Sequence, residues 1–169
     1  MSLNELLFTL INSFAGQNQV LDYTMMFFTG AGIIIIAAIA LFTKDKLLII
    51  KSIAAGLLAY ALSFLVKISY YTPRPFVENP AVHLLTMHDP DPSFPSTHTL
   101  IAVTLATVIY QHNKKLGIIS FLIALIVGFS RVYVGVHYPS DVFWSSLIGI
   151  TIGLATVKGV NYYNQSRKI

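Results

Sequence analysis

Five apolar segments that can cross a lipid bilayer as helices constrain this 169-residue chain more than any other feature of its sequence. They cover residues 23–43, 47–71, 98–111 with their flanks, 116–136 and 141–160. About 20 apolar residues in a helix span the hydrocarbon core of a membrane. Charged residues make up 11% of the chain, against about 25% in soluble domains, which excludes a water-soluble globule. The sequence therefore predicts an all-α, polytopic membrane helix bundle, with residues 1–169 forming a single domain.

A sixth segment, residues 2–16, precedes these five and differs from them because it is amphipathic. Its apolar residues recur at helical spacing, and Ser2 and Glu5 have the spacing of a capping box. At about 22 Å it is short for a membrane span. We expect a helix that lies in the membrane interface, with a short, tilted span as the alternative. It is not expected to be a cleaved signal peptide, because neither a basic start nor a small-residue cleavage pattern is present.

One long polar stretch, residues 72–95, interrupts the apolar segments and contains six of the seven prolines. Proline lacks the N–H donor that a helix needs, so this stretch is expected to be a loop. Structured loops of about this length are often functional. In the last apolar segment, Gly149 and Gly153 have the spacing that favours close helix packing. The chain has no cysteine, which excludes disulfides, thiolate metal sites and cysteine nucleophiles.

Basic residues divide the connecting loops into two sets. Six of the seven acidic residues and the loop 72–95 fall on one side of the expected bundle, and a lysine-rich set falls on the other. Cytoplasmic loops of membrane proteins are enriched in lysine and arginine. We therefore expect the C-terminus to be cytoplasmic and the loop 72–95 to face outward. The lysine-rich set consists of Lys44, Lys46, Lys114, Lys115, Lys158, Arg167 and Lys168.

The remaining basic residues gather at the expected outer ends of the helices. Any one of them could be an anchor that reaches the interface, but ionisable residues at membrane depth are functional candidates by default. Two arginines and a lysine match the oxygens of a phosphoryl group. Ser96 to His98 follow a proline and open a helix, where backbone N–H groups can face an anion. The candidates are Lys67, Arg74, Ser96, His98, Arg131, His137 and Asp141.

His137 and Asp141 are four residues apart across a turn that contains Pro139. A carboxylate on one ring nitrogen of a histidine fixes its tautomer and leaves the other nitrogen free to attack. A second histidine, His98, is suited to protonate a leaving oxygen. This combination points to phosphoryl transfer.

The spacing of these residues resembles a known three-part signature. Lys67 begins the run KISYYTPRP, Pro95 begins PSTH, and Ser130 begins SRVYVGVHYPSD. These runs match K-x6-R-P, P-S-x-H and S-R-x5-H-x3-D of the type 2 phosphatidic acid phosphatase family. Two features depart from the family: Thr97 stands where many members have glycine, and the first segment is short and amphipathic where a spanning helix is usual.

The resemblance implies a role for each matched residue. His137 would be the nucleophile that forms a phosphohistidine, and Asp141 would orient it. His98 would act first as acid and then as base for the hydrolytic water. No metal or other cofactor is implied, because the cations supply the charge that Mg²⁺ supplies elsewhere. The phosphoryl group would be bound by Lys67, Arg74, Ser96, Thr97 and Arg131.

The loop 72–95 carries further details of one subgroup. The runs PRPFV from Pro73, HLL from His83 and SFPS from Ser93 resemble the bacitracin-resistance type of undecaprenyl-diphosphatase. This resemblance implies hydrolysis of undecaprenyl diphosphate at the outer face of a bacterial plasma membrane, for cell-wall synthesis, with no nucleic-acid partner. The alternatives are a phosphatase of phosphatidylglycerophosphate or phosphatidic acid and, in another class, a lipid-headgroup transporter or scramblase.

Three other groups of polar residues are not expected to be catalytic. His88, Asp89 and Asp91 are expected to be a solvated part of the loop, with a metal site as the less favoured alternative. His83 is expected to lie in the loop or at the rim of the substrate site. His112 belongs to a lysine-rich turn and has no suggested role.

Overall fold

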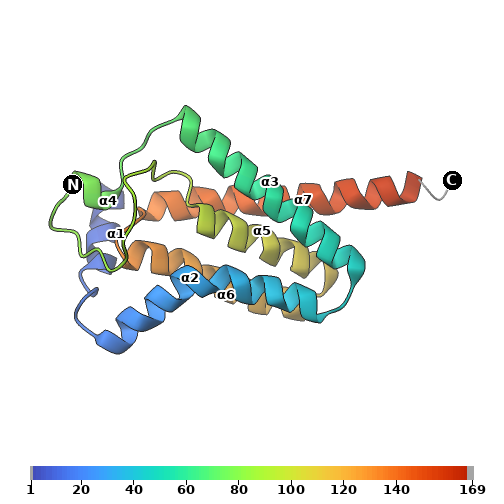
Figure 1. The fold of residues 1–169 in the computed structure, drawn as a ribbon, viewed down its shortest axis with the longest axis horizontal. Helices are drawn as coiled ribbons and strands as arrows, with labels where there is room; N and C mark the ends of the chain where they lie inside the picture. Colours follow the sequence, from blue (N-terminus) through green and yellow to red (C-terminus); the bar gives the residue numbers. More distant parts are fainter. Residues whose placement is uncertain (1, 167–169) are drawn as a thin grey trace.

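The computed structural model describes residues 2–166, which form an all-helical bundle (Figure 1). Two short helices, α1 and α4, accompany five longer ones, and the described residues contain no strand. The five longer helices run alternately between two ends of the bundle. Arg167 and Lys168, two of the residues expected on the cytoplasmic side, lie outside the described residues. The helices are α1 (Leu3–Asn12), α2 (Gln19–Phe42), α3 (Lys46–Ser69), α4 (Pro75–Glu78), α5 (Thr97–His112), α6 (Lys114–Tyr133) and α7 (Pro139–Ser166).

Four of the five expected spans, α2, α3, α6 and α7, are long and apolar enough to cross a membrane. The fifth, α5, has 16 residues and is therefore about 24 Å long, shorter than the other four. It packs against α2, α3, α6 and α7, and ten of its residues are buried. The prediction of a polytopic membrane bundle is confirmed, with α5 as its central helix.

Helix α1 starts as the sequence predicts. The Ser2 side chain accepts a hydrogen bond from Glu5 N, and the Glu5 side chain accepts one from Ser2 N. With ten residues, α1 is about 15 Å long, too short to span, which removes the tilted span as an alternative. Its buried Asn12 donates to the backbone carbonyls of His83 and Tyr133, so α1 is fixed to the end of the bundle that bears the long loop.

The connections separate by charge as well as by position. The short α2–α3 and α5–α6 turns, which contain Lys44 and Asn113, lie at one end of the bundle, and the loop 72–95 lies at the other (Figure 1). Side-chain caps from Asp45 and Asn113 start α3 and α6, each accepting from a backbone N–H three residues ahead. The lysine-rich turns and the long loop are therefore on opposite sides of the apolar helices.

The predicted close packing at Gly149 and Gly153 is observed between α7 and α5. A Cβ atom at Gly149 would lie 2.8 Å from the carbonyl oxygen of Leu100 and 3.3 Å from the backbone nitrogen of Thr104. Thr104 Oγ1 also donates to the Gly149 carbonyl at 3.2 Å. Because backbone atoms oppose both positions, no side-chain rotation makes room there.

We expect Gly149→Ala to lower stability by about 1–3 kcal/mol, because the added methyl group forces α7 away from α5. Gly159→Ala is the matched control in the same helix, since a Cβ atom there meets nothing within 4 Å. Thermal unfolding of both variants in detergent, followed by circular dichroism, checks this. Equal midpoints for the two variants would show that the α5–α7 contact is not tight.

Candidate active site

His137 lies in the turn that joins α6 to α7, and its position is fixed by the backbone. The backbone N–H groups of Val136 and His137 both donate to the Arg131 carbonyl at 3.2 Å. Gly135 makes this turn with a φ of +88°, and a Cβ atom there would lie 2.9 Å from the His83 carbonyl oxygen. The His137 ring is consequently held at the end of the bundle that carries the long loop, with only 1% of the residue exposed.

One side of the His137 ring faces a carboxylate and a serine. His137 Nδ1 is 3.5 Å from Asp141 Oδ2 and 3.3 Å from Ser93 Oγ. Ser93 Oγ donates to Asp141 Oδ2 at 2.6 Å, and the Tyr138 backbone N–H donates to the same oxygen at 3.0 Å. Asp141 is thus held by two donors beside the ring. Ser93, which is fully buried, was not among the predicted site residues.

The other ring nitrogen faces Arg74, whose guanidinium is almost completely buried. Arg74 Nη1 donates to the Val136 carbonyl at 2.7 Å and lies 3.3 Å from His137 Nε2. A guanidinium can only donate, so Nε2 is the acceptor and the ring proton belongs on Nδ1, toward Ser93 and Asp141. Burial, followed by the charges of Arg131 and Arg74, holds the pKa of His137 well below its ordinary value. The ring is therefore neutral, and the lone pair on Nε2 accepts the hydrogen bond from Arg74.

Lys67 and Arg74, seven residues apart, converge on one loop residue, Asp91. Lys67 Nζ is 2.7 Å from Asp91 Oδ2, and Arg74 Nη2 is 2.8 Å from Asp91 Oδ1. The loop backbone contributes as well, because the Pro92 carbonyl accepts from Lys67 Nζ at 2.6 Å. The expectation that Asp91 is a solvated loop residue is wrong in part, because its side chain is 40% exposed but both of its carboxylate oxygens are paired with these cations.

Arg131, the third cation, meets the same loop through His88. Arg131 Nη2 is 3.0 Å from His88 Nε2, which must be the acceptor. Burial, followed by the charge of Arg74, lowers the pKa of His88 and keeps the ring neutral. The expectation of a solvated His88 is therefore also wrong. Arg131 Nε is buried and has no hydrogen-bond partner among residues 2–166.

The predicted residues at the start of α5 make contacts with neighbouring helices. The buried Ser96 donates its backbone N–H to Ser145 Oγ at 2.9 Å, and its hydroxyl is 3.0 Å from Thr99 Oγ1. Thr97 Oγ1 is 2.6 Å from Ser63 Oγ of α3. The contacts with Ser145 and Ser63 therefore attach the start of α5 to α7 and α3, whereas the Ser96 hydroxyl bonds within α5.

His98 lies in the first turn of α5 and is half-buried. The charges of Arg131, Lys67 and Arg74 act on it, so it shares their end of the bundle. All eight predicted residues thus lie around one end of the helix bundle.

The remaining polar candidates lie apart from this cluster. His83 is tied to α1, since its ring Nδ1 is 2.8 Å from the Ala15 carbonyl and its backbone N–H donates to Asn12. His112 ends α5 at the opposite, lysine-rich end. No group of three or more His, Asp or Glu among residues 2–166 is arranged to hold a metal ion.

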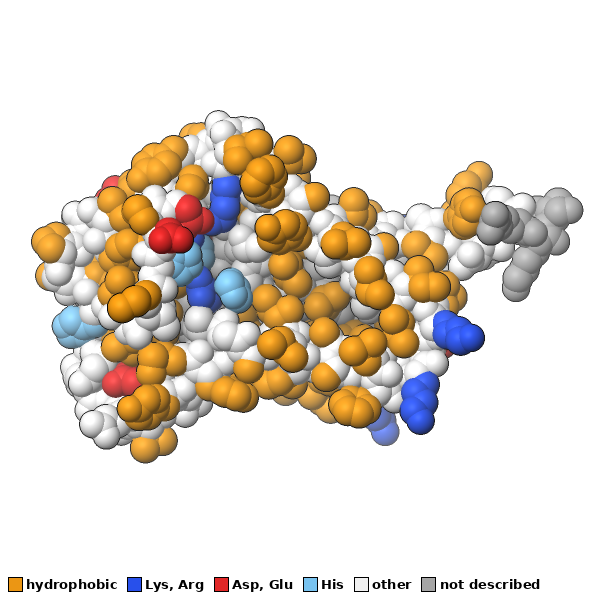
Figure 2. Space-filling view, in the orientation of Figure 1, with side chains coloured by type: hydrophobic (Ala, Val, Ile, Leu, Met, Phe, Trp, Pro, Cys, Tyr) orange, Lys and Arg blue, Asp and Glu red, His pale blue; other side chains and the backbone are white. Residues whose placement is uncertain are grey.

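Part of this cluster of charged and histidine side chains is visible at the surface of the protein. In Figure 2, lysine or arginine, acidic and histidine side chains meet in a hollow near the end that carries the long loop. Hydrophobic side chains border the hollow and continue along the membrane helices. A neutral histidine close to three cations, with an apolar border, can hold a phosphoryl group attached to a lipid.

The chain is similar to several known membrane phosphatases and lipid diphosphatases. Undecaprenyl-diphosphatase BcrC of Bacillus subtilis is 36% identical over 157 residues, covering 89% of this chain and 81% of the relative. The undecaprenyl-diphosphatase of Sulfolobus acidocaldarius is 32% identical over 158 residues, covering 90% and 76%. The crystal structure of Aquifex aeolicus LpxE superposes with a TM-score of 0.81 at 36% identity, covering 94% of this chain and 96% of that one.

The family model of the PAP2 superfamily matches residues 47–165, a range that contains all eight predicted site residues. The resemblance inferred from the three motifs is confirmed, and the chain belongs to the PAP2 superfamily.

Proposed function

We propose that the protein hydrolyses undecaprenyl diphosphate to undecaprenyl phosphate and inorganic phosphate. The observation that carries this proposal is the geometry of His137, which presents a neutral Nε2 3.3 Å from the buried guanidinium of Arg74. Two relatives that cover most of the chain are named undecaprenyl-diphosphatase, which supports this substrate over other phosphorylated lipids.

The reaction follows from the tautomer of His137. Its Nε2 lone pair attacks the terminal phosphorus, and the bond from that phosphorus to the bridging oxygen breaks. Undecaprenyl phosphate leaves with a proton supplied by His98. Asp141 and Ser93 stabilise the positive charge that develops on the ring, because they face its Nδ1–H. His98 then takes a proton from water, whose oxygen attacks the phosphorus of the phosphohistidine. The bond from phosphorus to Nε2 breaks, which releases phosphate and restores the neutral His137 ring.

The three cations supply the electrostatic part of catalysis. Phosphoryl transfer spreads negative charge over three oxygens, and preorganised cations stabilise that charge. Lys67, Arg74 and Arg131 come from α3, the loop and α6, so they surround the phosphorus from different sides. The buried Arg131 Nε, which has no partner among the described residues, supplies a donor for a phosphoryl oxygen.

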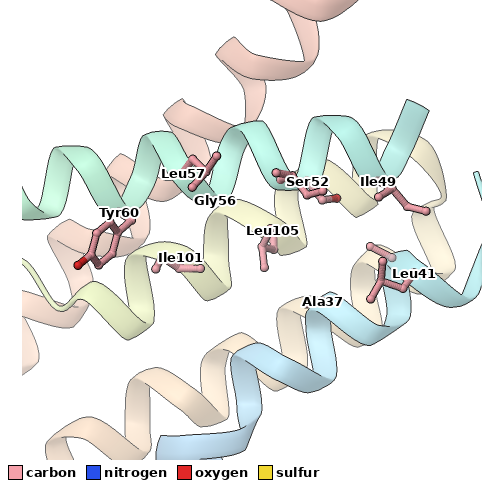
Figure 3. A pocket seen from close by; sticks show the side chains of 11 residues that line it. Ala37, Leu41, Ile49, Ser52, Gly56, Leu57, Tyr60, Ile101 and Leu105 are labelled. Atoms are coloured by element: carbon pink, nitrogen blue, oxygen red, sulfur yellow. The ribbon is translucent and has the colours of Figure 1, made fainter. Parts of the chain in front are cut away.

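An apolar groove beside the site suits a long hydrocarbon chain. It has a volume of about 540 Å³ and lies between α2, α3 and α5 (Figure 3). Ile101 and Leu105 line it, and they follow His98 by three and seven residues on the same face of α5. Tyr60 lines it from α3, seven residues before Lys67. None of the predicted site residues lines the groove, which runs along the membrane helices from Tyr60 and Ile101 to Leu41 and Ile49.

The charge distribution supports an outward-facing site. The lysine-rich turns lie at the end opposite the loop 72–95, and basic loops are retained in the cytoplasm. We infer that the phosphatase acts at the outer face of a bacterial plasma membrane and has a cytoplasmic C-terminus. Phosphate release outside the cell would regenerate a lipid carrier for cell-wall synthesis.

His137→Ala is expected to lower kcat by at least about a thousandfold, because it removes the nucleophile. His112→Ala is the matched control, since His112 lies at the other end of α5. The measurement is phosphate release by the purified protein with EDTA present, comparing undecaprenyl diphosphate, phosphatidylglycerophosphate and phosphatidic acid. Preference for a glycerolipid would contradict the proposed substrate, and a lack of release from all three would contradict a phosphatase and favour a transporter.

Ser93→Ala is expected to lower kcat by about 10- to 100-fold with little change in KM, because Asp141 loses its 2.6 Å donor and His137 Nδ1 loses a contact. Ser146→Ala is a suitable control, since that hydroxyl bonds only to its own helix, at Val142 O. Steady-state kinetics with undecaprenyl diphosphate separates the two constants. A rise in KM at constant kcat would show that Ser93 binds substrate.

The absence of natural cysteines allows a direct test of orientation. Met87→Cys, in the fully exposed part of the loop, should react in intact cells with a maleimide that cannot cross membranes. Lys115→Cys, at the start of α6, should react only after the membrane is permeabilised. The opposite labelling pattern would place the active site in the cytoplasm.

A further inference from the structure

The loop residue Asp91 occupies the hydrogen-bond donors that a phosphoryl group would need. Its Oδ1 accepts from Arg74 Nη2 at 2.8 Å and from Arg74 Nε at 3.1 Å, and its Oδ2 accepts from Lys67 Nζ at 2.7 Å. A carboxylate and a phosphoryl group present similar pairs of oxygens to such a fork of donors. Asp91 therefore stands in the position of the substrate anion.

The same loop also covers the third cation. His88 Nε2 accepts from Arg131 Nη2 at 3.0 Å, and His88 Nδ1 is 3.5 Å from Asp91 Oδ1. All three cations of the candidate phosphate site are thus engaged by residues of one loop. Bound substrate must take over donors that the loop now holds.

Asp91 is built to move away while the cations stay in place. Its side chain is 40% exposed, whereas that of Arg74 is 1% exposed. The backbone carbonyls of Asp91 and Pro92 also accept from Arg74 Nε at 2.9 Å and from Lys67 Nζ at 2.6 Å. These carbonyls can hold the two cations after a side-chain rotation has removed the carboxylate.

The chain after Asp91 is firmly fixed, which limits the movement to the exposed side. Ser93 is fully buried, and its backbone N–H donates to the Thr72 carbonyl at 2.8 Å. The Phe94 backbone N–H donates to Thr72 Oγ1 at 2.8 Å. Asp89 and Pro90, on the other side of Asp91, are exposed. Displacing Asp91 therefore leaves Ser93 beside His137 and Asp141.

The electrostatic balance favours an ionised carboxylate here. Burial alone would raise the pKa of Asp91, but the hydrogen bond from Lys67 and the charge of Arg74 outweigh it and hold that pKa below its ordinary value. The ionised Asp91 carboxylate carries a single negative charge, which neutralises the three cations only in part. A diphosphate carries more negative charge, so it can displace this carboxylate. Inorganic phosphate carries fewer charges than the substrate, so it competes less well with the Asp91 carboxylate for these cations.

We propose that Asp91 is an internal anion of the phosphate site, displaced by the substrate and returning to displace the product phosphate. The proposal rests on the proposed function, since it takes these cations as the phosphoryl-binding groups. It makes Asp91 a residue that determines which anions the site retains: polyanionic substrate binds, and inorganic phosphate is released.

The test is the affinity for inorganic phosphate, measured by calorimetry on the full chain in detergent. Asp91→Asn keeps the size of the side chain and removes its charge, so we expect affinity to rise about five- to tenfold as two partly exposed ion pairs cease to compete. Asp89→Asn is the matched control, because it removes the same charge two residues away at an exposed position. Phosphate affinity of this control should stay within about twofold of the wild type.

The outcomes separate this proposal from the proposed function. Unchanged or weaker phosphate binding in Asp91→Asn, or equal gains in both variants, would overturn the role of Asp91. Absence of phosphate binding in all three proteins would overturn it too. Calorimetry needs no turnover, so tighter phosphate binding in Asp91→Asn supports the internal anion even if the protein fails to hydrolyse undecaprenyl diphosphate.

Discussion

The buried guanidinium of Arg74 is the group on which the arrangement of the site depends. It reaches the Val136 carbonyl in the turn that holds His137, and it reaches Asp91 in the long loop. A buried charge is tolerated only when it is paired and its donors are satisfied, so the loop and the turn must come together around it. The same contacts place a donor against His137 Nε2, which sets the tautomer of the ring. Folding and chemistry therefore share one set of hydrogen bonds.

The helix bundle supplies the frame for this charge. Helix α5 is the shortest of the five long helices and the most buried, and α7 approaches it through Gly149 and Gly153. This close contact sets the first turn of α7, which carries Asp141, beside the first turn of α5, where Ser96 N–H donates to Ser145. Gly149 and Gly153, in the apolar part of α7, thus help to determine where Asp141 lies at the end of the bundle that carries the long loop.

Much of this could be predicted from the sequence because it depends on local periodicity and motif spacing. The long apolar helices, the capping box of α1 and the three motifs are properties of short runs of residues. The roles of Ser93, Asp91 and His88 were not predictable in this way, because each depends on where a proline-rich loop folds back. Asp91 was expected to belong to a solvated part of the loop, and only the folded structure shows that it pairs with Lys67 and Arg74. The run SFPS that begins at Ser93 was used only as a sign of the subgroup, and it does not indicate that the Ser93 hydroxyl contacts His137 and Asp141.

The central claim is that His137 carries the phosphoryl group during turnover. The most direct measurement is rapid acid-free quenching of the protein during hydrolysis of undecaprenyl diphosphate labelled with ³²P in its terminal phosphate. The account predicts label on the protein that is stable to alkali and labile to acid, located on a peptide containing His137, in both the wild type and His98→Ala. Continued turnover with no label on the protein in either case would contradict it, because water would then attack the lipid diphosphate directly.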